Sequence, residues 1–326
     1  MAKFCIGIDL GGTFIKVALL DEQRRPTPTR EFETPIHEGP DAVVAAIVAS
    51  ARRMVKEHGL AKGDLLGVGI GSPGPIDISE GVIITLPNIP GMDNVPLREL
   101  VSKGLGLPAV LENDANAAAY GEFIRGAGVG TANMVLLTLG TGVGSGIVVD
   151  GKILHGAHDM GGEWGHVVVQ PGGEPCACGQ AGCLERYSSA TYLAQYATRL
   201  IREEGRDSSL SKLLDQGKTL NAKDIVDAAK AGDELAAEVW DRATYHLAVA
   251  CVNISRIFDP DCVVLGGGMA RAGDELLVPV RRYFRQLHWA LTPVRMEIHL
   301  ASLGPDAGVI GAAGVAWSGL GDGCDT

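Results

Sequence analysis

Hydrophobic and polar positions along the chain predict strands and helices in an order that occurs twice. Short apolar runs bounded by glycine or proline predict strands, and apolar positions three and four apart predict helices. The predicted strands cover residues 3–9, 14–21, 65–71, 109–111, 133–139, 145–150, 261–265 and 295–301. The predicted helices cover residues 41–57, 115–125, 189–204, 222–231, 233–257, 273–286 and 308–318. Strands followed by helices in both halves predict an α/β fold and suggest an internal duplication.

Glycine-rich turns follow three of the predicted strands. We expect the first two to form exposed hairpin tips, whose backbone N–H groups can approach an anion closely because glycine lacks a Cβ atom. The third run leaves bare backbone against which a flat adenine could lie. One such turn is usually only a turn, but three in this order favour nucleotide binding. The glycine and threonine residues of the three turns are Gly11, Gly12, Thr13, Gly140, Thr141, Gly142, Gly144, Gly266, Gly267 and Gly268.

Length and charge narrow the classes of function. A chain of 326 residues is about twice the common size of one domain, so we expect two domains around a cleft. We place residues 1–116, with a returning helix at about 305–326, in a small domain and residues 117–304 in a larger one.

The net charge of −11 opposes binding to nucleic acid. Apolar runs are shorter than the ~20 residues that span a bilayer, and no signal-peptide pattern opens the sequence. We therefore expect a cytoplasmic protein without a membrane partner.

Four residues have the chemistry of a metal site. His166, Cys176, Cys178 and Cys183 offer one imidazole and three thiolates, a closed tetrahedral set typical of structural Zn²⁺. A redox pair or unrelated thiols are the alternative, but the compact spacing and intervening glycines favour zinc. The remaining cysteines in apolar contexts are expected to be buried: Cys5, Cys251 and Cys262. Two nearby histidines match no ligand spacing and are expected at the surface: His155 and His158.

A polar sequence ends the short strand at 109–111. Glu112, Asn113 and Asp114 precede the predicted helix at 115–125. Phosphoryl transfer to a hydroxyl requires a base beside that hydroxyl and cations on the phosphates. Asp114 is a candidate for this base, although a lone aspartate here is more often a helix N-cap.

These motifs resemble the ROK family of sugar kinases and sugar-responsive repressors, within the actin/hexokinase superfamily. The resemblance covers the whole chain and is most specific at residues 161–166, GGEWGH, and 176–185, CACGQAGCLE. It implies a two-domain actin-like ATPase (ribonuclease H-like) fold with an interdomain cleft. It also implies ATP-dependent phosphorylation of the 6-hydroxyl of a hexose. D-glucose is the expected substrate, with N-acetylglucosamine, N-acetylmannosamine, mannose and fructose as alternatives.

The resemblance further implies roles for single residues. Asp114 would take the proton of the sugar hydroxyl, and Asp9 would order Mg²⁺. The implied sugar contacts are Gly74, Asn88, Asn113, Asp114, Glu163, His166 and Glu185. The implied ATP contacts are Asp9, Lys16 and the residues of the three glycine turns, although an outward lysine is more often solvated. His166 would bind zinc through one ring nitrogen and face the sugar with the other. Trp164 departs from the smaller aliphatic residue common in relatives, which bears on the choice of sugar.

The family also contains repressors, which carry a helix-turn-helix ahead of the first strand. Only two residues precede Lys3 here, and the charge of −11 opposes DNA binding, so a kinase is expected. Family members often form dimers or tetramers. We therefore expect a homodimer or homotetramer.

Overall fold

Two five-stranded sheets repeat one arrangement in the computed structural model, which describes residues 3–86, 89–291 and 293–321. The strand orders are β3-β2-β1-β4-β7 and β10-β9-β8-β11-β12. In each sheet the first three strands of this order are antiparallel, and the last two run parallel to the central strand. The first sheet contains β1 (Phe4–Leu10), β2 (Phe14–Asp21), β3 (Arg30–Glu33), β4 (Leu65–Ser72) and β7 (Ala109–Asn113). The second contains β8 (Met134–Leu139), β9 (Val143–Val149), β10 (Lys152–Ile153), β11 (Cys262–Gly266) and β12 (Glu297–Leu300). A separate hairpin is formed by β5 (Ile76–Asp77) and β6 (Val82–Ile83).

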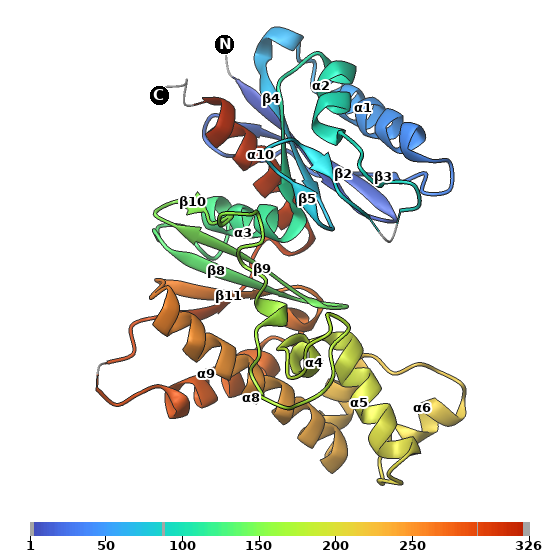
Figure 1. Cartoon of the computed structure of the whole chain (residues 1–326), viewed down its shortest axis with the longest axis vertical. Helices are drawn as coiled ribbons and strands as arrows, with labels where there is room; N and C mark the ends of the chain where they lie inside the picture. Colours follow the sequence, from blue (N-terminus) through green and yellow to red (C-terminus); the bar gives the residue numbers. More distant parts are fainter. Residues whose placement is uncertain (1–2, 87–88, 292, 322–326) are drawn as a thin grey trace.

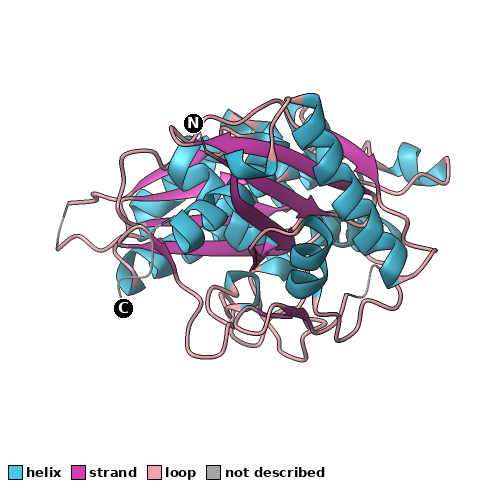
Figure 2. Cartoon of the chain, turned by 90° about the horizontal axis from the view of Figure 1, so that it is seen from above, coloured by secondary structure: helices cyan, strands magenta, loops and turns pink. Residues whose placement is uncertain are grey.

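Helices cover both faces of each sheet (Figures 1 and 2). On the first sheet, alternate side chains pack on α1 (Pro40–Glu57) and α2 (Leu97–Leu105) on one face and on α10 (Ala307–Gly321) on the other. The second sheet packs against α3 (Asp114–Arg125) on one face. Its other face packs on a helical layer that includes α5 (Ala190–Arg202) and α8 (Glu234–Ile257). Consequently α3 and α10 lie between the two sheets. Among the helices of the described ranges, none combines the length with the hydrophobicity that crossing a bilayer requires.

The helices have the following bounds. Those nearest the first sheet are α1 (Pro40–Glu57), α2 (Leu97–Leu105) and α10 (Ala307–Gly321). Those nearest the second sheet are α3 (Asp114–Arg125), α4 (Glu185–Ser188), α5 (Ala190–Arg202), α6 (Ser211–Asp215), α7 (Ala222–Lys230), α8 (Glu234–Ile257) and α9 (Asp274–Leu287). Short 3₁₀ helices are η1 (Lys62–Asp64), η2 (Trp164–His166), η3 (Gly268–Ala272) and η4 (Gly304–Asp306).

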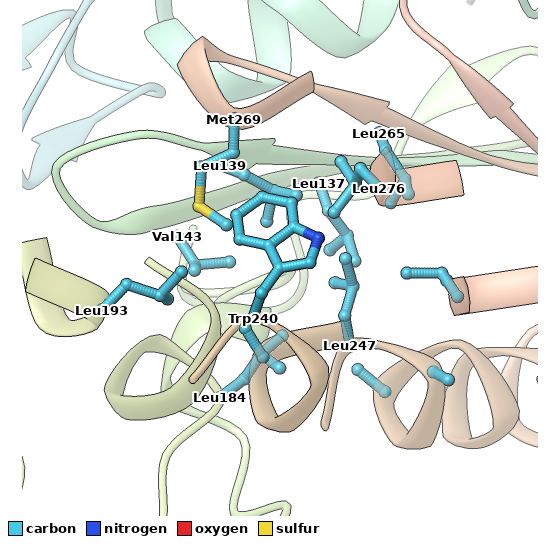
Figure 3. Close-up of a cluster of buried hydrophobic side chains, with 14 of the residues drawn as sticks. Leu137, Leu139, Val143, Leu184, Leu193, Trp240, Leu247, Leu265, Met269 and Leu276 are labelled. Carbon is cyan, nitrogen blue, oxygen red and sulfur yellow. The ribbon is translucent and has the colours of Figure 1, made fainter. Parts of the chain in front are cut away.

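The core beneath the second sheet fixes the position of the second glycine turn. Trp240 of α8 lies among Leu137 and Leu139 of β8 and Met269 (Figure 3). Its indole N–H donates to the carbonyl of Glu275 at 2.8 Å, so the ring is buried without an unsatisfied donor. Since the turn at 140–144 directly follows β8, this packing holds it rigidly above the helical layer.

The structure differs from the predicted elements mainly where the hydrophobic pattern is short. The strand at 30–33 and the hairpin at 76–83 were not predicted, because each has too few apolar positions to define a period. The helix at 97–105 was also missed, although Leu97, Leu100, Val101 and Leu105 have helical spacing. The predicted helix at 41–57 begins at Pro40, and Gly39 takes the N-cap position. Proline suits this first helical position because its missing N–H has no partner there in any case. The longer predicted strands and helices are confirmed within a few residues.

Candidate active site

A cavity of about 450 Å³ lies where the two sheets, α3 and α10 meet. The four acids that line it come from three separate elements: Asp9 from β1, Asp114 and Glu122 from α3, and Glu185 from α4. Two of the glycine turns reach it as well. The predicted site residues in its lining are Asp9, Asp114, Gly140, Thr141, Gly142, Gly144, Glu185, Gly266 and Gly267. The fold therefore gathers acids and bare backbone from both halves of the sequence.

Other predicted contacts lie outside this lining. These are Gly11, Gly12, Thr13, Lys16, Gly74, Asn113, Glu163, His166 and Gly268. Asn88 lies outside the described residues. Lys16, whose role was left open, donates from Nζ to the carbonyl of Pro305 at 2.8 Å and lies 3.9 Å from Glu31. It therefore ties β2 to the segment that precedes α10.

Asp9 is held at the carboxyl end of β1, where its carboxylate lies against Gly308 in the first turn of α10. Burial and then the charge of Asp114 raise the pKa of Asp9 to about 6, against the opposing effect of Lys16. The positive end of the α10 dipole favours the ionised form. A buried carboxyl group whose charge is disfavoured by a second carboxyl group in the same cavity suits a divalent cation, so the residues present fit Mg²⁺.

The sequence alternative for Asp114, that it caps α3, is wrong. The helix begins at Asp114, and the cap is Asn113, whose Oδ1 accepts the backbone N–H groups of Ala115 at 2.9 Å and Asn116 at 3.2 Å. Burial raises the pKa of Asp114, and a hydrogen bond from the Ala115 N–H at 2.8 Å opposes this shift. A partly buried carboxylate with a raised pKa is a stronger base than one in water, as a general base requires.

The third glycine turn touches the backbone at the end of β8, just before the second glycine turn. Gly267 has a φ of +80°, and a Cβ atom there would lie 2.6 Å from the backbone of Leu139. Only glycine fits this approach. Next to it, the N–H of Val143 donates to Oε2 of Glu185 at 3.0 Å, which fixes the start of α4 against the second turn.

Glu122 is a cavity residue that was not predicted. It is fully buried, and its carboxylate accepts backbone N–H groups from Leu303 at 2.8 Å, Ala127 at 2.8 Å and Ser302 at 3.1 Å. It therefore holds the segment before α10 at the edge of the cavity. The available signal was a glutamate on the apolar face of the predicted helix at 115–125. Further unpredicted lining residues are Thr138, Ala301, Gly304 and Gly308.

The expectation that His155 is a surface residue is wrong. Its Nε2 lies 2.7 Å from Oε2 of Glu112, a residue that is only 1% exposed, and the imidazole is itself partly buried. The sequence did not reveal this contact because Glu112 lies in β7 and His155 in the loop after β10, 43 residues further along the chain. His158 is exposed, as expected.

The four predicted metal ligands come together in the loop before α4. Their ligand atoms all lie within 4.8 Å of one another. The Sγ atoms of Cys178 and Cys183 are 3.6 Å apart, and Sγ of Cys176 is 3.8 Å from Nδ1 of His166. Bonds of about 2.0–2.3 Å to a tetrahedral zinc ion give ligand separations of about 3.5–3.8 Å. The donor set and its spacing therefore fit zinc. The three isolated cysteines, Cys5, Cys251 and Cys262, are buried, as expected.

Comparisons with known proteins agree with this geometry. The pattern of the ROK family matches residues 5–318. A glucokinase from Halalkalibacterium halodurans is 41% identical over 95% of this chain and 93% of its own. The ROK hexokinase of Thermus thermophilus is 34% identical with a TM-score of 0.83, covering 99% of this chain and 100% of that one. A ROK glucokinase from Streptomyces griseus in complex with glucose and AMPPNP is also 34% identical, with a TM-score of 0.76 and coverage of 97% and 99%. The two-sheet architecture is thus the actin-like ATPase fold of these enzymes, and the chain belongs to the ROK family.

Proposed function

We propose that this protein is an ATP-dependent hexose kinase that phosphorylates the 6-hydroxyl of D-glucose. Relatives named glucokinase, and a related structure that holds glucose and an ATP analogue, support this function. The structural observation that carries it is the cavity in which Asp9, Asp114 and two glycine turns converge. A cavity with bare backbone on one side and carboxyl groups on the other suits a nucleotide phosphate facing a hydroxyl.

Asp114 is proposed as the general base. The 6-hydroxyl oxygen attacks the γ-phosphorus, the bond from that phosphorus to the β–γ bridging oxygen breaks, and ADP leaves with the electron pair. The hydroxyl proton passes to Asp114. Because the transferred phosphoryl group needs little covalent help, the protein contributes mainly position and charge. The backbone N–H groups of the turns at 11–13 and 140–144 are proposed to hold the phosphates, and the run at 266–268 the adenosine.

Asp9 is the proposed holder of Mg²⁺, directly or through water. When bound, this cation neutralises the charge that develops on the transferred phosphate. The charge of Asp114 beside Asp9, and the raised pKa of Asp9, support this assignment. Thr13 and Thr141 are proposed to donate hydrogen bonds to the phosphates. Lys16 is proposed to support this side of the site through its hydrogen bond to the carbonyl of Pro305.

The sugar would be recognised by side chains around the loop that precedes α4. Asn113, Glu163, His166 and Glu185 are proposed to bind its hydroxyls, with Gly74 and Asn88 in flanking loops. Zinc bound by His166, Cys176, Cys178 and Cys183 would fix the ring of His166 and leave its second nitrogen for the sugar. The metal therefore serves structure and orientation. Trp164 is buried, so its bulk shapes this loop from inside.

Several broader expectations stay predictions. The proposed division places residues 1–116 and about 305–326 in one domain and residues 117–304 in the other, and the packing of α10 on the first sheet supports it. Closure of the cleft between the domains would exclude water from the phosphates. Association into homodimers or homotetramers, a cytoplasmic location and a place in glycolysis remain predictions.

A panel of hexoses tests the function directly. Release of ADP is followed with glucose, mannose, fructose, N-acetylglucosamine and N-acetylmannosamine as acceptors. We expect the highest kcat/KM with glucose. A higher value for an acetamido sugar would contradict the glucose assignment and leave the kinase chemistry intact, whereas no ADP release with any acceptor would contradict both.

A further inference from the structure

We propose that His155 is a positioning residue for phosphoryl transfer, because its pairing with Glu112 holds the sugar-binding loop against the end of strand β7. The inference rests on the proposed kinase function and adds to it a residue that has no role in the scheme above. The sugar-binding loop is defined here as residues 155–166.

Glu112 is fixed on the first sheet and immediately precedes Asn113 and Asp114. It is 1% exposed. Its Oε1 accepts the N–H of Asn113 at 2.9 Å and the side-chain amide of Asn116 at 3.0 Å. Its Oε2 is left for His155, at 2.7 Å. A buried carboxylate needs a hydrogen-bond partner for each oxygen. His155, from the loop after β10, therefore completes the hydrogen bonding of Glu112 at the end of β7.

His155 is fixed on the second sheet. The N–H of Leu154 donates to the carbonyl of Ile147 in β9 at 2.8 Å, which extends the strand pairing to the residue before His155. The carbonyl of His155 in turn accepts the N–H of Gly161 at 2.8 Å. The His155 backbone therefore closes the sugar-binding loop on itself, just ahead of Glu163.

Other residues of the loop are held by β9 of the second sheet and by the β5–β6 hairpin. The hydroxyl of Ser145 in β9 donates to the carbonyl of Gly162 and accepts the N–H of Trp164, the latter at 3.0 Å. Asp159 accepts the N–H of Ile78, in the β5–β6 hairpin, at 3.2 Å. The loop thus contacts elements of the proposed small domain at two points, and at the contact with Glu112 it meets a fully buried carboxylate.

Charge at this bridge is supplied by three groups. The hydrogen bond that His155 donates to Glu112 raises the pKa of His155, burial opposes the shift, and the charges of Glu112 and Asp159 add to it. Protonation of His155 therefore brings a positive charge to Glu112, two residues from Asp114. Loss of His155 would leave a buried carboxylate unpaired beside the proposed base and would free the loop that carries Glu163 and His166. The unpaired carboxylate would act on the glucose hydroxyl, and the freed loop would weaken the contacts with glucose. Neither effect acts directly on ATP.

The test compares three variants in the full-length protein. His155→Ala removes both the hydrogen bond and the charge, and His155→Gln keeps an N–H donor that never gains a proton. His158→Ala is the matched control, since His158 is an exposed histidine of the same loop. Steady-state KM values for glucose and for ATP are measured by ADP release between about pH 6 and 9, the range that brackets histidine titration. Calorimetry gives glucose affinity without turnover, and thermal unfolding checks the fold.

We expect His155→Ala to raise the KM for glucose at least ~10-fold and to change the KM for ATP less than ~3-fold. Because protonation of His155 strengthens the pair, the wild-type KM for glucose should rise as the pH passes upward through the pKa of His155. His155→Gln should show a smaller increase and lose this pH dependence, and His158→Ala should match the wild type.

A wild-type KM for glucose in His155→Ala, or equal increases for both substrates, would overturn the inference. Should His155→Ala fail to fold, His155→Gln decides, and retention of the wild-type pH dependence overturns the inference. If the wild type phosphorylates no hexose, the proposed function fails, while the calorimetric affinities still test His155 by the same comparison.

Discussion

Gly142 lies directly against the carboxylate of Glu185, so close that a Cβ atom at position 142 would overlap Oε2. The neighbouring N–H of Val143 donates to the same oxygen at 3.0 Å. The second glycine turn therefore does two things. It lines the cavity where we propose that a phosphate binds, and it makes room for and orients an acid proposed to bind the sugar. We therefore expect this contact to couple the proposed nucleotide and sugar sites.

Gly142→Ala should weaken glucose binding because the new methyl group must displace Glu185. We expect the affinity for glucose, measured by calorimetry without nucleotide, to fall about 10-fold or more. Gly140→Ala is the matched control in the same turn, since a Cβ atom at position 140 meets no atom within 4 Å. Its glucose affinity should equal that of the wild type. Equal affinities in both variants would contradict the coupling between Gly142 and Glu185.

Glu122→Gln should impair the nucleotide side selectively. The wild-type carboxylate accepts from the backbone at Ala127, Ser302 and Leu303, and an amide would place N–H groups against these donors. We expect a loss of roughly 1–3 kcal/mol in the free energy of unfolding. The KM for ATP should increase more than the KM for glucose, because the displaced segment before α10 borders the cavity. Denaturant titration and steady-state kinetics measure the two effects, and a larger change in the KM for glucose would argue against this placement.

The zinc site predicts about one zinc ion per chain by metal analysis. Cys178→Ser should lose the metal, lower the thermal stability and weaken glucose binding, because folding of the loop and metal binding are coupled. Cys262→Ala serves as the control, since it removes a buried thiol of β11 outside the cluster and should keep the metal. Metal-free wild-type protein with full activity and unchanged stability would rule out the site.

We expect Asp9→Asn to raise the stability of the protein and to lower its activity. Its pKa in the folded protein is about 6 against an ordinary value of 3.8, so the folded state binds this proton more tightly than the unfolded chain does. The stabilising contribution of protonated Asp9 is therefore complete below about pH 4 and is lost as the pH rises to about 6. In metal-free buffer, Asp9→Asn should be more stable than the wild type at neutral pH, by about 1 kcal/mol or more, with the difference vanishing near pH 4.

The same substitution should abolish most of the kinase activity, because an amide cannot hold the cation as a carboxylate does. Asp207→Asn, at an exposed aspartate, is the control and should change neither quantity. If Asp9→Asn were less stable than the wild type at neutral pH, the burial of a destabilised charge at this position would be contradicted.

The sequence predicted the features that local patterns encode. Residues 133–150 show two apolar runs around glycines, and the structure has the hairpin β8–β9 there. The spacing of His166, Cys176, Cys178 and Cys183 likewise predicted a cluster that the structure assembles. In both cases all the information lies within some 20 residues, so no knowledge of the tertiary fold was required.

Contacts between distant segments could not be predicted in this way. Glu112 of β7 pairs with His155 in the loop after β10, and Glu122 accepts the N–H of Ser302, 180 positions away. The choice of Asn113 over Asp114 as the helix cap depends on side-chain geometry that both residues could adopt, since aspartate and asparagine are equally good caps. These features follow from which elements α3 packs against.

Replacement of Asp114 by asparagine tests the account most directly. Release of ADP and formation of glucose 6-phosphate are measured for the wild type and for Asp114→Asn, together with glucose affinity by calorimetry. We expect the wild type to form both products in equal amounts, and Asp114→Asn to lose at least ~100-fold in kcat while its glucose affinity stays within about 10-fold. Because Asn113 caps α3, the variant should lose no stability, and removal of the buried charge of Asp114 should raise its stability at neutral pH. A kcat near the wild-type value in Asp114→Asn would contradict the catalytic role of this carboxylate.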